Sequence, residues 1–237
     1  MKKKKETQKE YIEKEPILKN VVETLETNYM PYAMSVILSR AIPEIDGLKP
    51  AHRKLLYTMY KKGLLTGDRT KSANIVGETM KLNPHGDGAI YETMVRLARG
   101  YEALPLPFID SKGNFGKVYS RDMAYAASRY TEAKLAPICR ELFDDIDKDT
   151  VDFIPNYDNS MQEPALLPVS FPTILTTPNQ GIAVGMASNI CSFNLAEVCD
   201  TVIALLENPD HPLELTLPGP DFSTGGQILC DPEELGR

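Results

Sequence analysis

The chain has 237 residues, of which 42% are hydrophobic and 25% are charged, and its formal net charge is -7. This composition is typical of a globular protein and excludes a wholly disordered chain or a small disulfide scaffold. A net charge of -7 would by itself argue against a nucleic-acid partner, because phosphate binding requires Lys and Arg.

The charge is distributed unevenly along the chain. Residues 1–20 carry a net charge of +3, and residues 21–48 carry a net charge of -3. Residues 49–130 hold fourteen Lys and Arg against seven acidic residues, whereas residues 131–237 hold four against eighteen. Because the local field attracts a ligand, the basic middle segment would suit a polyanion. On charge alone, an equally good interpretation is that the basic and acidic segments pair with each other within the fold.

The start of the chain and its cysteines indicate a soluble cytoplasmic protein. Residues 1–27 are expected to form a charged arm, because the opening MKKKKETQKE continues with charge instead of the apolar run of a signal peptide. No stretch of about 20 apolar residues that could cross a membrane is present. Without CxxC or Cys/His ligand spacing, buried free thiols in a reducing cytosol are expected. The cysteines are Cys139, Cys191, Cys199 and Cys230.

Apolar residues recur at helical spacing in the first half of the chain. Pro43 ends the first predicted helix, and Pro50 suits the first turn of the second. The glycine-rich junction NPHGDG then gives the helix-loop-helix layout of a helix-turn-helix unit. The predicted helices cover residues 28–42, 50–63, 71–82 and 88–100.

The second half is predicted to be richer in strands. Residues 105–120 have the pattern of strands joined by a turn, and residues 122–143 are helical or extended. Prolines and the short β-type runs VDFIP, ALLPVSFPTIL and GIAVG follow, and residues 218–237 begin another strand-rich piece. A helix is expected over 194–207, with Asn194 as its N-cap. The fold class is therefore α+β, helical first and strand-rich later.

The sequence lacks the common motifs of nucleotide and metal chemistry. It has no GxxxxGK[ST] phosphate loop, so ATP is not bound in that way, and no GxSxG, HExxH or paired metal-ligand motif. The acidic run DDIDKD at 144–149 is interpreted as a solvated face instead of a metal site. No metal site is therefore predicted within the chain.

Two short stretches carry candidate chemistry. In PHGDG, glycines precede a helix whose N-terminal N–H groups can bind an anion, and His85 can hydrogen-bond a phosphate oxygen. The alternative is a plain loop in which Asp87 caps the helix. In SRYTE, Tyr130 can act as a nucleophile, and Arg129 can stabilise both its phenolate and a phosphoryl group. The alternative is a surface tyrosine next to an arginine.

Taken together, these stretches resemble one family, the breakage-reunion subunit of bacterial type IIA DNA topoisomerases, which is the A subunit of DNA gyrase or of topoisomerase IV. The resemblance runs in order from about residue 28 to 225, and several long motifs in the right order are far more specific than a lone glycine motif. The motifs are YAMSVILSRAIPEIDGLKPAHRKLLYTM (32–59), NPHGDGAIYETMVRLAR (83–99), GNFG (113–116), SRYTEAKLA (128–136), TVDFIPNYD (150–158), GIAVGMASNI (181–190) and PGPDF (218–222).

The resemblance implies catalytic roles for individual residues. Tyr130 matches the nucleophile that attacks a DNA phosphodiester and keeps the 5′-phosphate, and Arg129 matches the arginine that supports the scissile phosphate. His85 matches a histidine near that site. Because each duplex is cut by two such tyrosines, one from each protomer, a homodimer bound to double-stranded DNA is implied.

The resemblance also implies DNA contacts. Lys49, His52 and Arg53 match basic residues that line the DNA gate. Ile182 matches an isoleucine wedged between base pairs, for which greater wrapped contact offsets the cost of unstacking. The helix from Gly88 to Arg99 matches the recognition helix of a winged-helix domain.

The implied domains are a charged N-terminal arm over 1–27, a winged-helix DNA-cleavage domain over 28–155 and the incomplete start of a tower domain over 156–237. ATP and Mg²⁺ would both act through a partner subunit in an A2B2 assembly, because that subunit supplies the ATPase and the metal-binding acids. The A subunit of gyrase is the main interpretation, in the bacterial cytoplasm with the chromosome. The alternatives are the A subunit of topoisomerase IV and, from a different class, a non-catalytic winged-helix DNA-binding protein, which would not need the Arg–Tyr pair.

The sequence departs from the family pattern at positions linked to drugs. Asn83 stands where the family often has a histidine, and Gly88 where a serine or threonine is frequent. Glu92 supplies the acid that is expected four residues later. In the family, these last two helix positions hold quinolones through a water-coordinated metal ion. Because Gly88 lacks the hydroxyl, a weakened quinolone response is expected.

Overall fold

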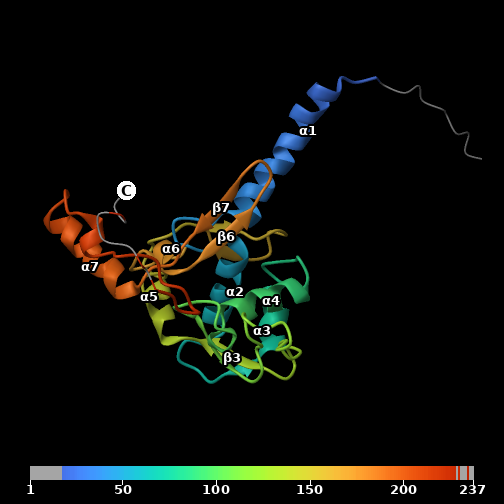
Figure 1. Ribbon diagram of the computed structural model, residues 1–237. Helices are drawn as coiled ribbons and strands as arrows, with labels where there is room; N and C mark the ends of the chain where they lie inside the picture. Colours follow the sequence, from blue (N-terminus) through green and yellow to red (C-terminus); the bar gives the residue numbers. More distant parts are fainter. Residues whose placement is uncertain (1–17, 228, 230–233, 235–237) are drawn as a thin grey trace, which may run out of the picture.

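The computed structural model describes residues 18–227, 229 and 234 (Figure 1). The predicted charged arm therefore lies largely outside the described residues, as does Cys230. Among the described cysteines, all free, Cys139 is buried as expected, Cys199 is partly buried and Cys191 is exposed. Within these ranges, every helix is too short or too polar to span a bilayer.

A long helix, α1 (Val21–Val36), continues as a π-helical turn, η1 (Ile37–Ala41). Helix α1 begins well before the predicted helix over 28–42, and η1 ends two residues before Pro43. Ala33 is the one buried residue among those described in α1. Figure 1 shows α1 projecting away from the rest of the molecule, which is consistent with its exposed surface.

The centre of the molecule combines a helical cluster with a small sheet. Helices α2, α3 and α4 pack against one another, and the antiparallel sheet has the order β1-β3-β2. The predicted helices over 50–63, 71–82 and 88–100 are confirmed within three residues at each end. The elements are α2 (Pro50–Lys61), β1 (Thr70–Lys71), α3 (Ser72–Thr79), α4 (Asp87–Leu97), η2 (Arg99–Tyr101), β2 (Ile109–Lys112) and β3 (Glu132–Leu135).

One hydrophobic core lies between these helices and the sheet. Each surrounding element contributes fully buried side chains to it: Leu55 and Met59 of α2, Met94 of α4 and Ile109 of β2. Ile109 pairs with Leu135 of the neighbouring strand β3. Burial of each such side chain stabilises the fold by about 1.5–3 kcal/mol. The core thereby fixes the relative positions of α4 and β3, and the SRYTE segment leads directly into β3.

The rest of the chain forms two hairpins and short helices. The hairpins pair β4 with β5 and β6 with β7, both antiparallel. Asn194 caps α7 as predicted, because its side-chain Oδ1 accepts the N–H of Ala196 at 2.9 Å. The elements are η3 (Pro137–Cys139), α5 (Arg140–Phe143), β4 (Phe153–Pro155), β5 (Gln162–Pro164), α6 (Thr173–Thr176), β6 (Asn179–Ile182), β7 (Ala187–Ile190), α7 (Leu195–Glu207) and η4 (Leu213–Leu215).

Two predicted β segments are wrong in detail. The run ALLPVSFPTIL contains no strand; its end forms α6, and its prolines lack the N–H that a ladder requires. The piece over 218–237 contains no strand among its described residues. The mixed α and β composition is nevertheless confirmed.

The β6–β7 hairpin lies against η1 at the base of α1 (Figure 1), and Gly181 makes this approach possible. A Cβ at Gly181 would collide with the backbone carbonyl of Ala41. We expect Gly181→Ala to destabilise the protein by about 1–3 kcal/mol through overpacking. Urea unfolding would measure the change. The matched control is Gly77→Ala in α3, where a Cβ meets nothing within 4 Å and a small gain in stability is expected; equal effects of both changes would contradict the close approach.

Candidate functional site

Tyr130 lies on the loop directly before β3 and is 67% exposed. The guanidinium carbon of Arg129 lies 4.7 Å from the centroid of the Tyr130 ring. A cation in this position interacts favourably with the ring and also attracts an anion that approaches the phenol. The pair is therefore accessible to a large anionic substrate.

The start of α3 holds this loop on both sides of the Arg–Tyr pair. The backbone N–H of Ala73 donates to the carbonyl of Ser128 at 3.1 Å, and the N–H of Ser72 donates to the carbonyl of Thr131 at 3.0 Å. Tyr130 itself donates its backbone N–H to Ala127 at 2.9 Å. Since the first N–H groups of a helix have no partner within the helix, the loop satisfies two of them.

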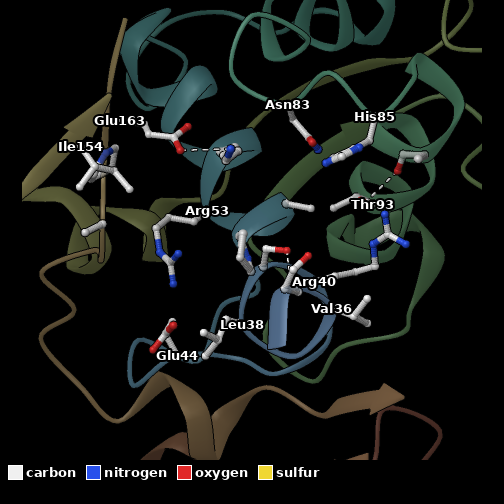
Figure 2. Close-up of a pocket in the computed structure, with 18 of the residues that line it drawn as sticks. Val36, Leu38, Arg40, Glu44, Arg53, Asn83, His85, Thr93, Ile154 and Glu163 are labelled. Carbon is white, nitrogen blue, oxygen red and sulfur yellow. Dashed lines mark hydrogen bonds and ion pairs between the residues drawn. The ribbon is translucent and has the colours of Figure 1, made fainter. Parts of the chain in front are cut away.

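A first cavity of about 800 Å³, which we term the Arg40 cavity, opens between η1, α2, the loop before α4 and the β4–β5 hairpin (Figure 2). Figure 2 shows Arg40 of η1, His85 and Glu163 around it. Lys54 also lines it, pairing with Glu163 at 3.1 Å and donating to the carbonyl of Leu82 at 2.9 Å. The cavity thus carries both signs of charge, and His85 faces it.

Arg53 also borders the Arg40 cavity, but its guanidinium is engaged inside the protein. Its Nε donates to Asp46 Oδ2 at 2.7 Å and its Nη2 to Asp46 Oδ1 at 2.9 Å, and the two side chains are 7% and 1% exposed. The same carboxylate accepts the backbone N–H of Leu48 and of Leu167, each at 3.0 Å. Through Asp46, Arg53 therefore fixes the turn that leads into α2. This role is structural, because the guanidinium is buried in the ion pair.

A second cavity of about 610 Å³, the Lys49 cavity, lies between α2, α4 and the β6–β7 hairpin. Lys49, His52 and Arg96 line it, and Lys49 Nζ donates to the carbonyl of Gln180 at 2.5 Å. Burial, followed by the charge of Arg96, lowers the pKa of Lys49. These basic groups make the cavity electropositive.

His52 is partly buried in the Lys49 cavity, and its Nδ1 is buried with no hydrogen-bond partner among the described residues. Burial lowers the pKa of His52 to about 4, and the charges of Lys49, Arg96 and Arg53 act in the same direction. The ring is therefore neutral near pH 7, so that it can offer a hydrogen bond without a charge.

The remaining predicted residues are exposed. Ile182 ends β6 at the tip of its hairpin and is 88% exposed. Gly88 and Glu92 lie one turn apart on α4, and Glu92 accepts a hydrogen bond from the Tyr125 hydroxyl at 3.3 Å. A Cβ at Gly88 would meet nothing within 4 Å, so the position is open to larger residues.

The structure divides the predicted catalytic and basic residues into three locations. His85 and Arg53 share the Arg40 cavity, Lys49 and His52 share the Lys49 cavity, and the described linings of both omit the Arg–Tyr pair. Sequence reasoning did not single out Arg40, Lys54 or Arg96. For Arg96 a signal was present, because positions 88, 92 and 96 follow one another at four-residue spacing on one face of the predicted helix.

Across the described part of the chain, no group of three or more His, Cys, Asp or Glu side chains is arranged to hold a metal ion. The acidic run at 144–149 follows α5, and Asp145 within it pairs with Lys148 at 2.6 Å.

A mixed α and β chain with an exposed Arg–Tyr pair, one electropositive cavity and an exposed hairpin tip is suited to contact a polyanion. The family model of the DNA gyrase/topoisomerase IV A subunit matches residues 40–236, and the chain belongs to this family. The resemblance stated from the sequence motifs is thereby confirmed.

Several relatives are identical to this chain at about half of the aligned positions. The A subunit of DNA gyrase from Granulibacter bethesdensis is 51% identical over 214 residues, which cover 87% of this chain and 22% of the relative. The A subunits of DNA gyrase from Dehalogenimonas lykanthroporepellens and Halalkalibacterium halodurans are 48% and 49% identical, each over 89% of this chain and 26% of the relative. The chain spans about a quarter of the length of the curated relatives it matches.

Proposed function

We propose that this chain forms part of the DNA-cleaving and religating subunit of an ATP-dependent type II DNA topoisomerase, an isomerase, and specifically of the gyrase A subunit. The observation that carries the proposal is the exposed Tyr130 with Arg129 against its ring, in a chain that belongs to this family. The names of the relatives favour gyrase over topoisomerase IV.

The proposed reaction is a reversible transfer of a phosphoryl group. The Tyr130 Oη attacks the phosphorus of a DNA phosphodiester and loses its proton, while the bond from phosphorus to the 3′-oxygen breaks and this oxygen gains a proton. The 5′-phosphate stays on Tyr130, and attack by the 3′-hydroxyl restores the duplex. Since the phosphotyrosyl bond conserves the energy of the phosphodiester, resealing needs no ATP. Arg129 stabilises the phosphate charge.

Mg²⁺ and ATP are proposed to act through a partner subunit in an A2B2 assembly. The lack of a metal-ligand cluster among the described residues is compatible with ligands from that partner. When bound, Mg²⁺ would supply charge stabilisation at the phosphate and at the leaving 3′-oxygen. Within this chain, Arg129 and the phenol of Tyr130 supply the groups that meet the phosphate.

The DNA-binding surface is proposed to combine the two cavities and the hairpin tip. The cluster α2–α3–α4 with the sheet β1-β3-β2 supports a winged-helix domain within 28–155, with α4 as recognition helix. Lys49, His52 and His85 would meet the DNA, with Arg53 holding α2 in place. Ile182 would enter the base stack, for which its exposed position at a hairpin tip is suited. The described residues after 155 would begin the tower domain.

A homodimer is proposed because both strands of a duplex must be cut, and the assembly would work on the bacterial chromosome in the cytoplasm. The test of the function is to identify the amino acid that becomes linked to DNA. The full-length protein, its ATPase partner, Mg²⁺ and 3′-labelled DNA would be trapped with denaturant, digested with trypsin and analysed by mass spectrometry. Label on the peptide that contains Tyr130 supports the proposal. DNA binding without any adduct would favour a non-catalytic DNA-binding protein.

Quinolone response gives a separate prediction at Gly88. The position is exposed on the first turn of α4, four residues before Glu92, and has room for a hydroxymethyl group. We expect Gly88→Ser to make the reconstituted enzyme more sensitive to quinolones, because a hydroxyl would join Glu92 in holding the drug's hydrated metal ion. Drug-stimulated DNA cleavage would be titrated for both enzymes. A Gly88→Ser enzyme of equal or lower sensitivity would overturn the assignment, and Gly88→Ala controls for size.

A further inference from the structure

Three buried hydroxyl groups lie directly beneath the loop that carries Tyr130. The Thr131 hydroxyl is 2.9 Å from the Tyr91 hydroxyl of α4 and 2.8 Å from the Ser72 hydroxyl at the start of α3. Thr131 and Ser72 are fully buried, and Tyr91 is 7% exposed. We term these three side chains the hydroxyl triad.

The hydroxyl triad is joined to the loop at two further points. The Tyr91 hydroxyl donates to the carbonyl of Ala126 at 2.8 Å, four residues before Tyr130. At the other end, the backbone N–H of Ser72 donates to the carbonyl of Thr131. The Thr131 hydroxyl donates to the Ser72 hydroxyl, and the Tyr91 hydroxyl donates to Ala126, so the loop is held at both ends from two different helices.

The polar triad is not required simply to fill the core. A buried hydroxyl costs free energy unless it is hydrogen-bonded, and apolar groups of the same shape can replace such a set with little change in stability. A buried hydrogen-bonded set, however, favours one geometry, because each hydrogen bond is directional. Burial also raises the pKa of Tyr91, so its hydroxyl stays protonated and continues to donate to Ala126.

The triad also joins the nucleophile loop to the helix that bears the proposed DNA contacts. Tyr91 lies on α4 between Gly88 and Glu92, which both face solvent. A displacement of α4 would therefore be transmitted through Tyr91 to Ala126 and Thr131, the residues on either side of the Arg–Tyr pair.

We propose that Tyr91, Thr131 and Ser72 are positioning residues, which hold the Tyr130 phenol in register with DNA seated on α4. This inference rests on the proposed function and deepens it, because these hydroxyls act through the loop and do not touch the phosphate. Loss of one hydroxyl would let the loop shift, and a misplacement of about 1 Å can slow a reaction by about 100-fold.

The test compares Thr131→Val and Tyr91→Phe, which keep side-chain shape and remove one hydroxyl each, in the full-length protein combined with its ATPase partner. We expect the single-turnover rate constant of adduct formation at saturating DNA to fall by about 10–100-fold, with the Kd for DNA changed by less than about twofold. Thr131→Ser restores the hydroxyl and is expected to recover most of the rate constant. The rate constant would be followed with 3′-labelled nicked duplex and Mg²⁺.

Matched controls separate positioning from a general loss of structure. Tyr60→Phe removes a hydroxyl that donates to Asp147 at 3.2 Å, and Thr79→Val removes a buried hydroxyl that donates only within α3. Both controls are expected to keep the parental rate constant. The inference is overturned if Thr131→Val forms adducts at the parental rate, or if Thr131→Ser fails to restore a reduced one. A parent enzyme that forms no adduct would refute the proposed function itself, and the inference with it.

Discussion

A Tyr130→Phe variant is expected to form no covalent adduct with DNA while it binds DNA as tightly as the parent. The phenol oxygen is the proposed attacking atom, and its removal should lower adduct formation by at least about 10⁴-fold. The ring and the cation of Arg129 beside it remain, so DNA affinity should be retained. Denaturing gels of labelled DNA would measure the adduct, and fluorescence anisotropy would measure the affinity.

The matched control for this variant is Tyr157→Phe. Tyr157 is 58% exposed, close to the exposure of Tyr130, and it lies in the turn between β4 and β5. The control is expected to form adducts at the parental level. Adducts that persist in Tyr130→Phe would show that a different residue is the nucleophile.

An Asp46→Ala variant is expected to lose about 3–5 kcal/mol of stability, because it leaves the Arg53 guanidinium buried without its counter-charge. Asp46 also accepts the backbone N–H groups of Leu48 and Leu167, so these two hydrogen bonds would be lost as well. Urea unfolding followed by circular dichroism would measure the free energy of unfolding. The double variant Asp46→Ala/Arg53→Leu should recover part of the loss, since no unpaired charge remains.

The control for the ion pair is Lys71→Ala. Lys71 pairs with Glu132 at 2.8 Å, but 55% of its side chain is exposed. Exposed pairs contribute about 0–1 kcal/mol, so a small change is expected. A loss in Asp46→Ala no larger than in Lys71→Ala would contradict the buried ion pair as the support of α2.

The sequence predicts the central helices well because their signals are local. The apolar spacing of α2, α3 and α4 and the Asn194 cap of α7 depend on residues within a few positions of each other. The start of α1 was not predicted, because Val21 and the residues after it lie in a segment that reads as a charged arm. Strand β3 was left ambiguous between helix and strand, because its pairing partners lie far away in the sequence.

The site was predictable only in part for the same reason. Tyr130, Arg129 and the basic residues follow from motifs, and the structure places each of them. The buried ion pair of Arg53 with Asp46 does not follow from a local pattern, because the two residues pair across a turn. The Asp46 carboxylate also accepts the backbone N–H of Leu167, which lies 121 residues away. The contact of Lys49 with Gln180 spans 131 residues, and no local pattern encodes it.

The hydrogen bond from Lys49 to Gln180 also determines how a force on the β6–β7 hairpin would be transmitted through the protein. The hairpin that presents Ile182 is fastened to α2 by Lys49 and is pressed by Gly181 against the backbone of Ala41. A wedge in a bent duplex bears the elastic recoil of the DNA. In this protein the force on the hairpin would pass through Lys49 directly to α2. Leu55 and Leu56 of α2 are fully buried in the core. In the proposed wedge role of Ile182, the hairpin would therefore be held rigidly. The recoil of the bent DNA would act on the body of the protein instead of displacing the hairpin tip.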